Sequence, residues 1–392
     1  MEVDAQPAAP EETTTGPAIM TAQVASDTRN PVASLKKQLG NTVFDLVCIF
    51  ASPRCDFRTL ARQASGQFGD ADVLACTTAG EIGNLGYQDG QIIAVGFPRR
   101  WFKSATYVIP RLDNLNSKAL MDAMIQSRFL MMQAAPSFQH EFALTLIDGL
   151  SLQEERLTAH LSSGLGPMPL FGGSSGDGTA FRQTLLARNG ETYENAALIA
   201  LVRSACAVKV FSIDHFMPSD TRMVVTRADP AQRIVYEINA EPAADEYARL
   251  LGRDASQLNS SVFAAHPVLV RLADTHHARS IQQVRPNGAL QFFSAIDEGM
   301  VLSLAEHDDI IRNLDDGLTN LAAPVAPERI IGCDCLFRRI AAEETQQGRA
   351  MSQMLTKHRV VGFSTYGEQI GSLHVNQTFT GVAIYPPSSS KG

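Results

Sequence analysis

Three short motifs in the sequence each place a carboxylate directly after a glycine. They are CTTAGE, GGSSGD and FSTYGE, they end at Glu81, Asp177 and Glu368, and each follows an apolar stretch. Glycine can adopt positive φ, so the backbone can turn sharply there and present its N–H groups together with the acid. We therefore predict converging turns whose acids face a ligand or a domain junction. The alternative is tight turns whose Ser and Thr side chains bond to local backbone groups.

The second motif also fits the pattern G-x-S-x-G, which would place Ser174 at a nucleophile elbow. Such an elbow needs a helix directly after the serine, whereas the following residues, DGTAFRQTLLARNGET, are typical of a hairpin. No histidine and aspartate stand out as partners for a catalytic triad. We predict no catalytic residue, and we expect that the protein is not an enzyme.

Two histidines lie on segments that alternate like strands. In VKVFSIDHFMP, Phe211, Ile213 and His215 share one strand face. A histidine at the end of an apolar face is either a hydrogen-bonded core residue or an axial haem ligand, which needs an imidazole in an apolar pocket. His374 shares a polar face with Asn376, which favours hydrogen bonding there and makes Asn376 a candidate ligand contact.

Cys333 and Cys335 form a C-x-C pair on a predicted strand, where both point to the same side. Two thiolates alone do not make a zinc or iron–sulfur site, which usually needs four protein ligands. Other cysteines or histidines could complete such a site only through the fold. A zinc or iron–sulfur centre at these two residues therefore stays open as an alternative.

The order of elements predicts an α+β fold. Buried strands such as TVFDLVCIFAS alternate with short helices such as DFRTLARQASGQFG, and turn dipeptides such as Asn189-Gly190 mark hairpins. The pattern restarts after about Val225. We predict two related domains of mixed, largely antiparallel sheets flanked by helices. The expected bounds are a disordered tail at 1–28, domains at 29–225 and 226–386, and a second tail at 387–392.

Composition excludes several classes of protein. Hydrophobic residues make up 45% of the 392 residues, which supports a sizeable core. The net charge of −8 without a basic block is unsuited to nucleic acid, because phosphate contact needs clustered Lys and Arg. No apolar run reaches the length of a membrane span, and six scattered cysteines favour free thiols. We expect a cytoplasmic protein with no nucleic-acid or membrane partner, and a homo-oligomer is an alternative that the sequence leaves open.

Several separated segments resemble the FIST sensory module. LACTTAGEIGNLGYQDGQIIAVGF and LFGGSSGDG are similar to its N-terminal (FIST N) half. IDEGMVLSLAE and VVGFSTYGEQIGSLHVNQTFTGVAIY are similar to its C-terminal (FIST C) half. The resemblance covers nearly the whole chain from about residue 30 to 386. It implies a bacterial ligand-sensing protein without enzymatic activity, and amino acids are the ligands inferred for the wider family.

The chain also resembles one branch of this family, the nitric-oxide-sensing protein (NosP) group, in being a short FIST protein without a kinase domain. This resemblance implies haem b as cofactor, nitric oxide as ligand and a histidine kinase as partner, in two-component and cyclic-di-GMP signalling. The segment DHFMPSDTRMVVTRADP carries the resemblance and contains His215. His215 is therefore the first candidate for the haem iron and His374 the second. The alternative is a metal-free module whose ligand contacts Glu81, Asp177 or Glu368.

Overall fold

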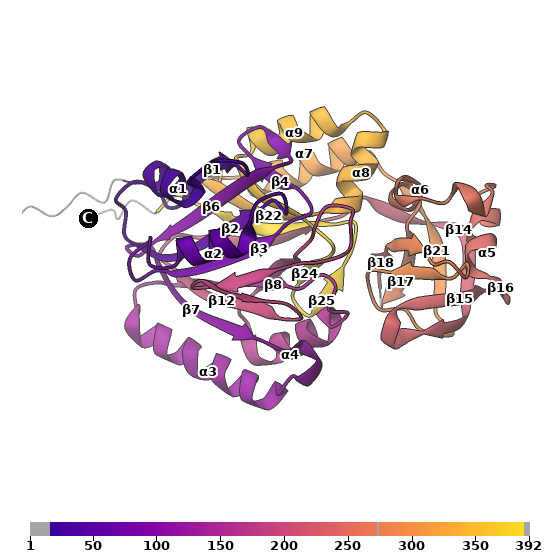
Figure 1. Ribbon diagram of the computed structural model, residues 1–392, viewed down its shortest axis with the longest axis horizontal. Coiled ribbons are helices and arrows are strands. Elements are labelled where there is room, and N and C mark those ends of the chain that lie inside the picture. Colours follow the sequence, from indigo (N-terminus) through magenta and orange to yellow (C-terminus); the bar gives the residue numbers. More distant parts are fainter. Residues whose placement is uncertain (1–15, 273, 388–392) are drawn as a thin grey trace, which may run out of the picture.

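The chain forms a large body from which a smaller lobe projects (Figure 1). The computed structural model describes residues 16–272 and 274–387. The chain leaves the body after β13 (Val208–Ile213), builds the lobe, and returns at α7 (Ile310–Leu321). The lobe is thus an insertion that is joined to the body by two neighbouring segments, residues 214–215 and 308–309.

The body consists of three copies of one unit. Each copy has an edge strand, a helix, a central strand, one or two further helices, a second central strand, a two-stranded hairpin and a final strand. In the first copy these are β1 (Met20–Ala25), α1 (Pro31–Leu39), β2 (Phe44–Ala51), α2 (Phe57–Ala64), β3 (Asp72–Thr77), β4 (Glu81–Gly83), β5 (Gly86–Gln88) and β6 (Gln91–Pro98).

The other two copies repeat this order. The second is β7 (Phe102–Ile109), α3 (Ser117–Ala134), β8 (His140–Ile147), α4 (Glu154–Leu165), β9 (Leu170–Ser174), β10 (Leu186–Arg188), β11 (Glu191–Tyr193) and β12 (Ala197–Ser204). The third is β13, α7, β22 (Arg329–Cys335), α8 (Leu336–Glu344), α9 (Gly348–Lys357), β23 (Val360–Thr365), β24 (Glu368–Ile370), β25 (Leu373–Val375) and β26 (Phe379–Ile384).

The three units exchange their hairpins in a cycle. In every sheet the two central strands are parallel, and a final strand and an edge strand continue the sheet on one side. On the other side the sheet takes the hairpin of another unit. β4–β5 joins the third sheet, β10–β11 joins the first, and β24–β25 joins the second. Asn189 and Gly190 form the turn of β10–β11 with positive φ, which confirms the hairpin predicted there.

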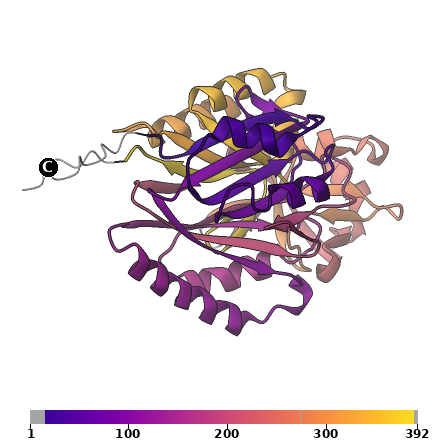
Figure 2. The ribbon, with the colours of Figure 1, turned by 60° about the vertical axis from the view of Figure 1, so that its left-hand side comes forward.

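The inner faces of the three sheets form a shared core, and the helices cover the outer faces. Phe50 of the first unit stacks on Phe363 of the third, with ring centroids 4.7 Å apart. Strand β2 is buried along its whole length, as its largely apolar sequence predicts. Helices α3 and α4 lie on one outer side and α7 to α9 on the opposite side (Figure 1 and Figure 2).

The lobe has its own antiparallel sheet, and its apolar core continues into Leu336 and Phe337 of α8 in the body. Tyr247, Phe263 and Phe292 are buried in this core. Its elements are β14 (Phe216–Asp229), β15 (Ile234–Ile238), β16 (Glu241–Pro242), α5 (Ala243–Leu250), α6 (Ser260–Ala265), β17 (Val268–Leu272), β18 (Thr275–Arg279), β19 (Ile281–Val284), β20 (Leu290–Phe292) and β21 (Val301–His307).

The predicted α+β class with mixed, largely antiparallel sheets is confirmed. The predicted tail at 1–28 is wrong for β1, which pairs with β6 because its backbone completes the edge of the first sheet. Residues 1–15 and 388–392 of the two predicted tails lie outside the described residues. The expected domain boundary near residue 225 falls within β14. Within the described residues, no helix has the length and apolarity to cross a membrane.

Candidate functional site

The three glycine-acid turns converge at the centre of the body, as predicted. Ala79 N–H donates to Ser364 O at 2.9 Å, and Ser364 N–H donates to Gly80 O at 2.7 Å. Ser174 N–H donates to Gly367 O at 2.8 Å. In these turns the lack of a glycine side chain matters more for close packing against neighbouring residues than for an unusual φ. Of the three, Gly80 alone has positive φ, whereas a Cβ on Gly367 would lie 2.3 Å from Cε1 of His374.

Glu81 and Glu368 occupy equivalent positions, and both are fully buried. Each takes a hydrogen bond from the threonine three residues earlier and another from the backbone just before or at the start of the unit's final strand. Burial raises the pKa of Glu81 to about 7 and that of Glu368 to about 8. These acids therefore tie each turn to its own unit.

Asp177 has a different role from the two glutamates. Its carboxylate accepts the backbone N–H groups of Phe181, Arg182 and Gln183 at 2.8 to 3.0 Å, and Tyr366 O–H also donates to it. Asp177 and Glu81 line one cavity of about 400 Å³. Glu368 lines none of the cavities described in this part of the chain.

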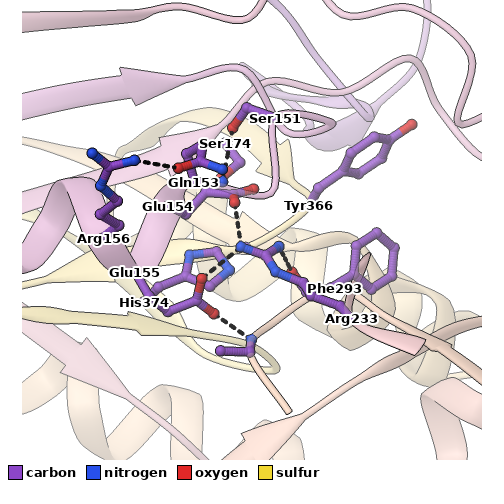
Figure 3. Close-up of polar contacts among 12 residues, drawn as sticks. Ser151, Gln153, Glu154, Glu155, Arg156, Ser174, Arg233, Phe293, Tyr366 and His374 are labelled. Atoms are coloured by element: carbon purple, nitrogen blue, oxygen red, sulfur yellow. Dashed lines mark hydrogen bonds and ion pairs between the residues drawn. The ribbon is translucent and has the colours of Figure 1, made fainter. Parts of the chain in front are cut away.

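A second polar site lies where the lobe meets the body (Figure 3). Arg233 of the lobe is 2% exposed, and its guanidinium pairs with Glu154 at 2.6 Å and Glu155 at 2.5 Å. Both acids begin α4, where the helix dipole also favours negative charge. Ala295 N–H of the lobe donates to Glu155 at 2.5 Å. Burial acts to raise the pKa of Glu155, but the neighbouring His374 ring and the positive charge of Arg233 lower it overall.

His374 lies at this junction, beside Glu155 (Figure 3). It is 3% exposed, and Nε2 of Gln369 donates to its Nδ1 at 3.1 Å. That bond places the ring proton on Nε2, which makes His374 an N–H donor toward the junction. Asn376 is fully buried and accepts the backbone N–H of Ser280, in the lobe, at 3.3 Å. Burial lowers the pKa of His374, so the ring is neutral at neutral pH.

The junction holds an unusual number of unsatisfied polar groups. Among the described residues, five buried side chains here carry an atom without a hydrogen-bond partner: Gln369 Oε1, His374 Nε2, Arg279 Nε, Ser280 Oγ and Ser294 Oγ. We call these five residues the junction cluster. The first two belong to the body and the other three to the lobe. Buried polar groups are nearly always hydrogen-bonded in proteins, so such a concentration indicates a site that binds a polar molecule.

An aromatic wall adjoins the junction cluster. The rings of Phe181, Phe293 and Tyr366 pack with centroids 5.0 to 5.5 Å apart. Phe181 and Phe293 also line a cavity of about 250 Å³ between the body and the lobe, together with Arg233. The five residues of the junction cluster do not line this cavity, which therefore adds apolar contact area next to the cluster rather than around it.

His215 lies at the connection between body and lobe and is 3% exposed. It lines a cavity of about 420 Å³ whose wall includes Asp308, Asp309 and Glu344. Arg338 donates to its Nδ1 at 2.9 Å. Because arginine can only donate, the ring proton must sit on Nε2, and the nitrogen that usually binds haem iron is then blocked. The acidic wall also suits an anionic porphyrin poorly.

The other predicted metal ligands do not fit a metal either. Nδ1 of His374 accepts the Gln369 amide, so its Nε2 is protonated in the same way as that of His215. Cys333 and Cys335 are buried in two different hydrophobic clusters, and burial raises the pKa of both thiols well above the usual value. Within the described residues, no group of three or more His, Cys, Asp or Glu side chains is placed to hold a metal ion.

The sequence pattern singles out His374 and Asn376 as candidates, but it does not single out Glu155 and Arg279. Glu155 stands in QEERL and Arg279 in THHARS, and both segments look like ordinary solvated surface. Ser174, considered above as a nucleophile, is fully buried and accepts a hydrogen bond from Gln369 at 3.0 Å. One local signal was present, namely the two adjacent acids Glu154 and Glu155 at the start of a predicted helix.

A polar site enclosed between two parts of one chain is the arrangement of a small-molecule-binding module. The FIST N domain family model matches residues 45–241, and the FIST C domain model matches residues 243–371. The chain therefore belongs to the FIST family, whose members are sensory ligand-binding modules in signalling. A search of curated proteins finds no match to this chain.

Proposed function

We propose that the protein is a metal-free sensory module that binds an amino acid at the junction between body and lobe. The unsatisfied atoms of the junction cluster carry this proposal. Its N–H and O–H donors suit a carboxylate, and the ionised Glu155 beside it suits an ammonium group. These residues replace Glu81, Asp177 and Glu368 as the proposed ligand contacts, because the buried donors without partners gather at the junction and not at the acids of the turns.

Binding at this place gives a route to a signal. The ligand would contact both the body and the lobe, which are joined by only two segments. A ligand that prefers one lobe position shifts the balance between positions by its difference in affinity for them. A partner protein can then respond to the position of the lobe. By the family resemblance, we propose a histidine kinase as that partner and no enzymatic activity in this chain.

Two serine variants test the binding site. Ser280 and Ser294 have hydroxyls without partners, so Ser280→Ala and Ser294→Ala remove no hydrogen bond from the free protein. We expect unchanged or slightly higher stability and about 5- to 10-fold weaker binding for each, measured by calorimetry with the twenty L-amino acids. Ser163→Ala, on the exposed side of α4, is the matched control. Absence of binding by the wild-type protein would reject the proposal.

Haem-based nitric oxide sensing is the competing proposal, and the cavity at His215 is the observation that favours it. The two proposals differ in a simple spectrum. Protein expressed with ample haem and then purified should show no stoichiometric Soret band if the metal-free proposal is correct. A stoichiometric band that is lost in His215→Ala would support the haem sensor instead.

A further inference from the structure

Arg279 differs from the other deeply buried arginines of the described chain. It ends β18, is 5% exposed, and has no carboxylate within ion-pair distance among the described residues. Arg233 and Arg338, which are buried to a similar degree, each have an acidic partner. The bond from Arg279 to Ala278 O is long, at 3.5 Å, and its Nε has no partner at all.

A buried guanidinium without an anion is costly. Burial lowers the pKa of Arg279, and the negative charge of Glu155 opposes this from a distance. Folded proteins compensate buried charges with a counter-ion or a hydrogen-bonded partner. Since the described chain supplies no paired carboxylate, a negatively charged group of a ligand would complete the site.

Short contacts connect Arg279 to the rest of the junction cluster. Ser280 follows it in the chain, donates its N–H to Asn376 and accepts the N–H of Phe293 at 3.0 Å. Ser294 comes next to Phe293, and the following residue, Ala295, binds Glu155. Glu155 acts electrostatically on both Arg279 and His374.

We propose that Arg279 binds the carboxylate of the ligand, with Ser280, Ser294 and the N–H of His374 as further donors. A guanidinium fork can make two parallel hydrogen bonds to a carboxylate, and the neighbouring hydroxyls can donate to its remaining lone pairs. Glu155 on the other side suits a positive group. The ligand class is therefore a zwitterion with a free carboxylate, and amines or amides that lack it are rejected. This inference rests on the proposed function.

The first test uses the wild-type protein and needs no variant. Calorimetry compares the amino acid that binds best in the L-amino-acid panel with its carboxamide and with the amine formed by its decarboxylation. We expect the two analogues to bind at least about 50-fold more weakly, because each leaves the guanidinium unpaired. Equal affinity of the amino acid and its carboxamide would overturn the inference.

The second test changes the arginine. Arg279→Gln should weaken binding of the amino acid about 50-fold, and Arg279→Lys about 10-fold, because lysine keeps the charge but loses the fork. The Arg279→Gln variant should also bind the carboxamide at least as tightly as it binds the amino acid. Arg253→Gln, on the exposed surface of the lobe, is the control and should bind normally. Unchanged affinity of a folded Arg279→Gln protein would contradict the inference.

The outcomes distinguish a failure of the proposed function from a failure of the carboxylate role of Arg279. If no amino acid binds the wild-type protein, the proposed function fails and the inference fails with it. If an amino acid binds but neither the analogues nor the Arg279 variants differ from it, the proposed function stands and the carboxylate role of Arg279 is wrong. Thermal unfolding of Arg279→Gln is expected at or above the wild-type temperature, since a buried unpaired charge is removed.

Discussion

Arg233, in the lobe, pairs with the Glu155 carboxylate, in the body, at 2.5 Å. The same guanidinium reaches Glu154, and both contacts lie beside the junction cluster. Because the covalent connection between the two parts is narrow, these ion pairs and the aromatic wall hold the lobe in place. A ligand that contacts Glu155 would therefore alter the ion pair between Glu155 and Arg233, which holds the lobe in place.

The ion pairs predict a graded loss of stability. Arg233→Met leaves two acids, Glu154 and Glu155, near each other without a cation, and should cost about 3–5 kcal/mol of unfolding free energy. Glu155→Gln keeps the contact between Arg233 and Glu154, and should cost about 1–3 kcal/mol. Urea unfolding at pH 7 measures both values. A larger loss in Glu155→Gln than in Arg233→Met would show that this network is not what holds the lobe.

Glu368 predicts a dependence of stability on pH. Its pKa is about 8 in the folded protein and near the usual 4.5 when unfolded. The folded state therefore holds a proton that the unfolded state releases. The stability that this proton contributes is complete below about pH 4.5 and is lost as pH rises through 8. As pH rises from 5 to 8, the unfolding free energy of the wild-type protein should fall by about 1–3 kcal/mol more than that of Glu368→Gln.

Glu81 provides the matched comparison for this pH effect. Its position is equivalent, but its pKa is only about 7, so the effect of Glu81→Gln should end at a lower pH. Urea unfolding at half-unit pH steps measures both curves. Identical pH profiles for wild type and Glu368→Gln would show that this carboxyl is ionised in the folded protein throughout the range.

Gly367 is predicted to control the orientation of His374. An added Cβ would lie 2.7 Å from Nε2 of His374 and 3.0 Å from the amide nitrogen of Asn376. Gly367→Ala should therefore displace the ring and weaken amino-acid binding at least about 10-fold, at a stability cost of about 1–3 kcal/mol. Gly371→Asn in the same hairpin is the control, because nothing lies near its Cβ and asparagine tolerates φ of 57°. Normal binding by Gly367→Ala would exclude this role.

His215 is predicted to be structural. His215→Ala removes the acceptor of the fully buried Arg338, and the loss of this hydrogen bond should cost about 1–3 kcal/mol. His215→Asn offers another acceptor and should recover part of the loss. Both variants should bind amino acids within about 3-fold of wild type, given the small effect of changes outside a site. A stable His215→Ala protein without amino-acid binding would place the histidine in the ligand site.

Local features were predictable from the sequence, and contacts between distant segments were not. The turns at Glu81 and Glu368 and the hairpin at Asn189 follow from residue chemistry within a few positions. The exchange of hairpins could not be predicted in this way, because the same strand pattern fits pairing within its own unit. Arg279 and Glu155 resemble surface residues, and the burial of Arg279 and the partial burial of Glu155 occur where the lobe packs against the body.

The cyclic exchange of hairpins has a consequence for how the protein is made. On the ribosome, the second unit emerges complete in sequence, yet its sheet lacks β24 and β25, which are translated only after the lobe and most of the third unit. The nascent body therefore keeps an open sheet edge on β9 until β24 has emerged. Such long-range pairing slows folding and exposes an edge that can join to other chains, so synthesis in cells should depend on chaperones that shield it.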